Sequence, residues 1–73
     1  MKREELIREL EEAVASNNSV ANEYRRNADR ARAAGPQADY ERCALWAEME
    51  TAYRYSAGFG AAILNHLRGV SPE

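Results

Sequence analysis

Apolar residues recur every seven positions along the first half of the chain. They form three rows: Ile7, Val14, Ala21 and Ala28; Leu10, Asn17, Tyr24 and Ala31; and Leu6, Ala13 and Val20. Such spacing is typical of one face of an α-helix, because residues three, four and seven apart lie on the same side. The pattern predicts a helix over about residues 3–34, a rod roughly 45 Å long at about 1.5 Å per residue.

A polar patch, Ser16-Asn17-Asn18-Ser19, interrupts the composition of this segment but not the phase of its rows. Serine and asparagine side chains bond to nearby backbone and often mark a helix cap, so a kink or local cap near Asn17 stays open. The alternative is a continuous helix with Asn17 on the apolar face. A buried asparagine there fixes the register or the number of partners.

The pair Gly35-Pro36 predicts the end of the first helix and the start of a second. Glycine suits the position after a helix, and proline is accepted in a first helical turn. Gly69 and Pro72 end the second segment in the same way. We therefore expect one all-α domain over residues 1–73, an antiparallel hairpin with a turn at 35–37, a helix over about 38–68 and a tail at 69–73.

The second helix carries apolar residues at alternating spacings of three and four. These positions are Trp46, Met49, Tyr53, Ser56, Gly60, Ile63 and Leu67, with Leu45, Ala52 and Phe59 along one edge. Aromatic rings at this spacing pack in a core more often than they bind a ligand. We expect Trp46, Tyr53 and Phe59 in the core.

Small residues occupy another flank of this helix: Ala44, Ala47, Thr51, Gly58, Ala61 and Ala62. Glycine inside a helix costs about 1 kcal/mol relative to alanine, so Gly58 and Gly60 need a reason, and close helix packing is the simplest. A hairpin has one internal contact, whereas this helix offers two packing faces. We expect oligomers, either a dimeric four-helix bundle or a larger ring.

The composition limits the partners, metal sites and reactions that we expect for this chain. The net charge of −2 gives no general attraction for DNA, RNA or an anionic membrane. Cys43 is the single cysteine and is expected to be a small buried hydrophobe, and the single histidine, His66, lacks nearby carboxylate partners for a metal.

No membrane span or signal peptide is expected, which indicates a cytoplasmic protein. No spacing resembles a catalytic site, so we predict neither enzyme activity nor a cofactor.

Basic residues gather at the turn of the predicted hairpin. Arginine forks and a helix N-terminus both suit phosphate oxygens, and tyrosine rings can stack on bases. The candidate ligand-binding residues are Arg26, Arg30, Tyr40, Arg42, Arg54 and Tyr55. The alternative is a solvated surface matched to the helix dipole, with the acidic residues Glu4 to Glu12 at the opposite end.

Residues 41–63 carry a further pattern: a basic and small-residue opening, a central segment with Met49, and small residues. The three parts are Glu41-Arg42-Cys43-Ala44-Leu45, Met49-Glu50-Thr51-Ala52 and Tyr53-Arg54-Tyr55-Ser56-Ala57. This stretch, about a third of the chain, resembles the hairpin domain of phage anti-CBASS and anti-Thoeris sponge proteins. It departs from them at Tyr55, where tryptophan is expected, and at Arg54, where an apolar residue is usual.

The resemblance implies a helical hairpin that oligomerises and sequesters a cyclic nucleotide or cyclic ADP-ribose immune signal without cleaving it. Such a phage-encoded anti-defence protein acts in the host cytosol. The alternative function is a helical inhibitor or adaptor that binds one host protein through its acidic face and its small-residue flank. A scaffold subunit without a ligand is a third hypothesis, whereas two long helices disfavour a helix-turn-helix DNA-binding protein.

Overall fold

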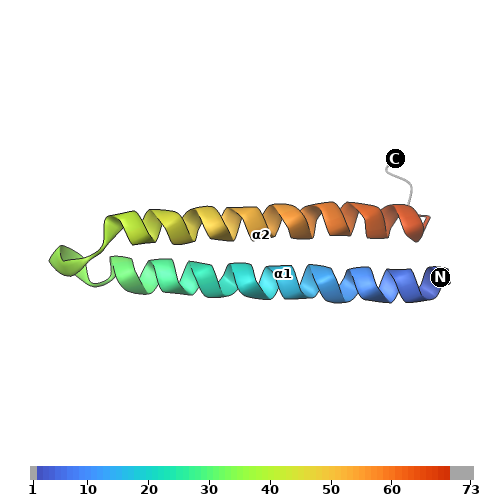
Figure 1. The fold of residues 1–73 in the computed structure, drawn as a ribbon, viewed down its shortest axis with the longest axis horizontal. Coiled ribbons are helices and arrows are strands. Elements are labelled where there is room, and N and C mark those ends of the chain that lie inside the picture. The colour runs from blue at the N-terminus through green and yellow to red at the C-terminus, as the bar shows by residue number, and fades with distance from the viewer. Residues whose placement is uncertain (1, 70–73) are drawn as a thin grey trace.

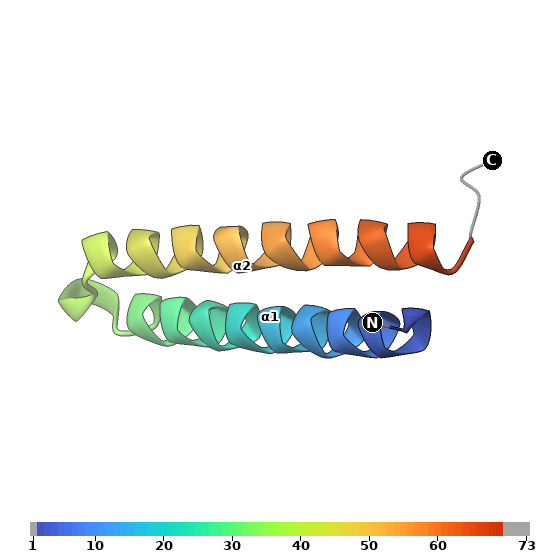
Figure 2. The same ribbon diagram turned by 45° about the vertical axis from the view of Figure 1, so that its right-hand side comes forward.

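The chain forms two long antiparallel helices, α1 (Arg3–Arg32) and α2 (Tyr40–Leu67), connected through a 3₁₀ turn, η1 (Gly35–Gln37) (Figure 1). The computed structural model describes residues 2–69. A view turned by 45° shows the helices side by side along their whole length (Figure 2). The all-helical prediction is therefore confirmed for the described residues. Beyond Gly69, the predicted tail lies outside them.

Helix α1 is continuous through the polar patch at residues 16–19, so a helix end there is excluded. Asn17 is half-buried on the side that faces α2, between Val14 and the fully buried Ala21. The prediction of a helix of about thirty residues is confirmed, since α1 spans 30 residues. The seven-residue repeat of the apolar rows predicted the continuity of α1 more reliably than the helix propensity of residues 16–19 did.

The turn follows the glycine–proline signal, but both helix ends differ from the prediction by a few residues. Gly35 has φ +65°, a left-handed conformation that glycine adopts readily, and α1 ends before it at Arg32. Pro36 lies in η1 rather than in α2. Helix α2 begins at Tyr40 because Asp39 caps it, its Oδ1 accepting a hydrogen bond from the Arg42 backbone N–H at 3.0 Å. This cap was not predicted.

The interface between the helices consists of small residues near the turn and larger residues near the opposite end of the hairpin. Its fully buried members are Ala21, Ala28, Cys43, Ala57 and Leu64. Cys43 is 2% exposed and its Sγ donates to the Ala28 carbonyl oxygen at 3.7 Å, which confirms the prediction of a buried thiol. The rings of Tyr24 and Tyr53 stack across the interface with centroids 5.8 Å apart.

The predicted core face of α2 is wrong in part. Trp46, Tyr53, Gly60 and Leu67 are half-buried as expected, but Ser56, Ile63 and Phe59 are exposed. The face that contacts α1 is centred instead on the buried residues Cys43, Ala57 and Leu64. Helix α2 is apolar on several sides, so its spacing alone does not choose which side faces α1.

Gly60 is the point of closest approach to α1. A Cβ at this position would lie 2.6 Å from Cγ2 of Val14, closer than packed atoms allow. Close packing within the hairpin therefore explains Gly60, as predicted. Gly58 has no atom within 4 Å of an added Cβ, so packing within the hairpin does not explain that glycine.

Replacing Gly60 by alanine is expected to lower the free energy of unfolding by about 1 kcal/mol. Overpacking costs about 1–3 kcal/mol, and better helix propensity offsets about 1 kcal/mol of it. Valine is stiff at χ1, so Val14 cannot turn its methyl group away cheaply. Urea unfolding followed by circular dichroism measures the effect, with Ser56→Ala as the control for helix propensity at an exposed position.

Gly60→Ala in a Val14→Ala background tests whether the contact with Val14 causes the loss of stability. With the Cγ2 methyl group removed, Gly60→Ala is expected to be neutral or stabilising relative to that background. An equal loss in both backgrounds would contradict the close approach of Gly60 to Val14.

Candidate functional site

Helix α2 exposes large apolar side chains on the side away from α1. Tyr55 is 68% exposed and Phe59 67%, and Leu45 and Ile63 are each at least half exposed. We call this side the outer face of α2. Since a helix that is apolar all round is usually buried, the outer face is the most unusual surface of the hairpin. Phe59 was expected in the core, and its exposure is the main correction to the predicted site.

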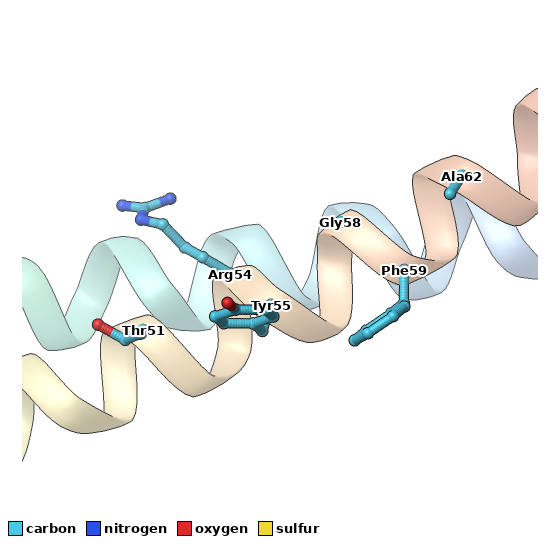
Figure 3. A pocket seen from close by; sticks show the side chains of 6 residues that line it. All are labelled: Thr51, Arg54, Tyr55, Gly58, Phe59 and Ala62. Carbon is cyan, nitrogen blue, oxygen red and sulfur yellow. The ribbon is translucent and has the colours of Figure 1, made fainter. Parts of the chain in front are cut away.

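An open groove of about 590 Å³ runs along one side of the outer face. Its lining residues are Thr51, Arg54, Tyr55, Gly58, Phe59 and Ala62 (Figure 3). The rings of Tyr55 and Phe59 lie one helical turn apart, with centroids 6.2 Å apart and planes inclined by 35°. The absence of a side chain at Gly58 leaves the backbone accessible between Arg54 and Ala62. The groove thus offers two ring surfaces, a short stretch of backbone and one cation.

Arg54 belongs both to the groove and to a polar network between the helices. Its Nε and Nη2 each lie 2.9 Å from Glu50 Oε2, and Nη2 also donates to Asn22 Oδ1 at 3.0 Å. Arg25 Nη1 approaches the same Glu50 oxygen at 3.9 Å. In Figure 3 the guanidinium points away from the Tyr55 and Phe59 rings. Arg54 therefore connects α2 to α1 as well as lining the groove.

The other candidate residues lie toward the turn. Arg26 and Arg30 are one turn apart on the exposed side of α1, and Tyr40 is 65% exposed at the start of α2. Arg42 lies 5.8 Å above the Trp46 ring, and its Nε is 3.9 Å from Asp39 Oδ2. At about 1.5 Å per residue, Arg42 and Arg54 are roughly 18 Å apart along α2.

The six predicted site residues therefore do not form one cluster within the hairpin. Arg54 and Tyr55 share the groove, and Arg30, Tyr40 and Arg42 lie near the turn. Arg26 lies between them, one helical turn after the Asn22 that Arg54 contacts. Thr51 and Phe59 line the groove and were missed as site residues. The spacing of Phe59, four positions after Tyr55, is the signal that could have indicated a shared exposed surface. At the opposite end Glu11 pairs with Arg68, as the antiparallel charge order predicts.

Comparisons with known proteins found no matching family model, no matching curated protein and no matching solved structure. The resemblance of residues 41–63 to sponge proteins therefore stays a prediction. Within residues 2–69, neither helix combines the length and the apolar character needed to cross a membrane.

Removing the Glu50 carboxylate is expected to destabilise the hairpin more than removing an exposed carboxylate does. The Glu50 side chain is 14% exposed and accepts from Arg54, so Glu50→Ala should lower the free energy of unfolding by about 1–2 kcal/mol. Asp29→Ala is the matched control, because Asp29 pairs with the same Arg25 but is 54% exposed. Its change should stay within about 0.5 kcal/mol. Equal losses in urea unfolding would show that the Arg54 network contributes nothing beyond a surface pair.

Proposed function

We propose that this chain is a non-catalytic sponge whose hairpins self-associate through the outer face of α2 and sequester an anionic cyclic nucleotide or cyclic ADP-ribose signal. The observation that carries the proposal is the groove, whose lining includes one arginine and two exposed aromatic rings. Following the resemblance, the protein would be phage-encoded and would act against host immune signalling in the cytosol.

The groove supplies both chemical elements that nucleotide recognition uses. Tyr55 and Phe59 present ring surfaces on which a base can stack. Arg54 donates through Nε and Nη2 inside the hairpin, which leaves Nη1 for a phosphate oxygen, and its side chain remains 44% exposed. Because Glu50 and Asn22 already fix the guanidinium, little side-chain entropy is lost when a ligand binds.

The basic group near the turn is the second place proposed for phosphate. Arg26, Arg30 and Arg42 carry positive charge, and Tyr40 could stack a base beside them. Within one hairpin Arg42, roughly 18 Å from Arg54 along α2, is too far from it to hold the same small ligand. Variants in the two groups therefore separate the two places.

A helical inhibitor or adaptor is the second candidate function. The groove is lined mainly by apolar atoms, which also suit the apolar side of an amphipathic helix from one host protein. This candidate requires no small molecule.

Native mass spectrometry against a panel of cyclic di- and trinucleotides and cyclic ADP-ribose isomers tests the proposal. We expect a discrete oligomer that gains ligand masses in whole multiples. Arg54→Ala should weaken binding by about 10- to 150-fold, the equivalent of about 1.5–3 kcal/mol for a charge-assisted hydrogen bond.

Arg25→Ala is the matched control for this variant. Arg25 contacts the same Glu50 oxygen but does not line the groove, so its removal should leave ligand affinity unchanged. Arg30→Ala reports on the basic group near the turn. An oligomer that gains no ligand mass from the panel would contradict the sponge and favour the adaptor.

A further inference from the structure

A regular row of residues runs along the outer face of α2. Its members are Glu48, Ala52, Tyr55, Phe59, Ala62 and His66. Their spacings alternate between four and three, which is the pattern of a coiled-coil seam. All six are exposed in the hairpin, so α1 covers none of them. We call these residues the outer row.

The outer row has nearly the same chemistry in both directions. Tyr55 and Phe59 stand at its centre, an alanine follows on each side, and Glu48 and His66 stand at its ends. The two members of each pair lie at equal distances from Ala57 along the helix. Such a row suits an isologous interface, in which the same patch must be complementary to itself after a two-fold rotation.

We propose that the outer row binds a second copy of this chain, with the two α2 helices antiparallel about a two-fold axis at the level of Ala57. In this register Tyr55 faces Phe59 of the second copy, and Ala52 faces Ala62. The dimer is a layer of four helices in the order α1, α2, α2, α1. This inference gives the self-association within the proposed function a defined face and register.

Charge selects the antiparallel direction. Glu48 faces His66 of the second copy, so a carboxylate lies opposite an imidazole, which can donate a hydrogen bond to it, at both ends of the row. A parallel pair would instead place Glu48 against Glu48 and Glu41 against Glu41. In the antiparallel register Glu41 lies beyond Leu67, the last residue of the opposing α2. Glu41 therefore does not face a residue of that helix. Like charges directly opposed would weaken a parallel pair.

The apolar area of the outer face suits a dimer. An aromatic side chain carries about 200 Å², and Tyr55 and Phe59 each expose about two-thirds of theirs. The four rings of a dimer could then bury on the order of 500 Å². Leu45 and Ile63 flank the row and add to it, which brings the pair toward the ~1,200 Å² of a small stable interface.

Gly58 gains an explanation from this arrangement. It lies one residue from the proposed axis, beside the row, and an added Cβ would meet nothing within 4 Å in the hairpin. The missing side chain allows the second helix to approach closely along this flank. Packing within the described hairpin gives no reason for a glycine at this exposed helix position.

Disulfide formation between cysteine variants tests the register. Ala52→Cys and Ala62→Cys are made separately in a Cys43→Ala background, and circular dichroism checks that each stays helical. In the proposed register residue 52 of one copy faces residue 62 of the other. Oxidation of an equimolar mixture should therefore give a mixed disulfide, whereas each variant alone should stay largely uncrosslinked. Efficient crosslinking of each variant alone would show a parallel pair and overturn the proposal.

Charge placed in the row tests the face. Phe59→Glu should weaken the dimer by on the order of tenfold or more in sedimentation equilibrium, because it buries a carboxylate among rings. The hairpin should stay folded, since Phe59 is 67% exposed within it. Ser19→Glu on the exposed side of α1 is the control and should leave the dimer unchanged.

A charge exchange tests the end pairs. His66→Glu should weaken the dimer, and adding Glu48→Lys should restore it by re-forming an opposite pair. A wild-type chain that stays monomeric up to high micromolar concentrations would overturn the proposal and assign the face to another partner. A dimer insensitive to Phe59→Glu would also overturn it.

The crosslink and the ligand masses, measured separately on chains that keep Phe59, separate this inference from the proposed function. A wild-type dimer with the predicted crosslink but without ligand uptake refutes only the sponge. Ligand uptake by a chain without this dimer refutes only the pairing.

Discussion

Two helices joined by a short turn share one interface, and this constraint governs the rest of the structure. Helix α1 has one apolar face and buries it against α2. Helix α2 has apolar residues on both of its sides, and the hairpin can cover only one of them. The covered side holds Cys43, Ala57 and Leu64, and the uncovered side holds Tyr55 and Phe59. The hydrophobic effect therefore stabilises the hairpin and also favours a further contact.

The sequence predicted the architecture because its strongest signals are local and periodic. The phase of the rows across Asn17 indicated a single long α1, and the glycine–proline pair located the turn. The orientation of α2 could not be predicted in the same way, because rows through Phe59 and through Ala57 both satisfy helical spacing. Gly60 lies near the boundary between the two sides and closely approaches Val14 of α1.

The candidate site was predicted less well than the fold, for a related reason. Tyr55 is exposed as expected, but Arg54 is not free, because Glu50 lies on the interface side of α2 and holds it. Sequence spacing alone does not show which of two neighbouring carboxylates an arginine contacts. Phe59 was assigned to the core by its type, whereas its actual position makes it part of the groove. Exposed aromatic residues are thus hardest to predict on a helix with two apolar sides.

The distribution of side-chain size along the interface has a consequence for local unfolding. Small residues such as Ala28 and Cys43 pack near the turn, while Leu10, Leu64 and Leu67 pack near the chain ends, where Glu11 also pairs with Arg68. Fraying normally begins at chain ends, which have few contacts. In this hairpin the first step of fraying must expose the largest aliphatic side chains, so the helix ends opposite the turn, within residues 2–69, are held together.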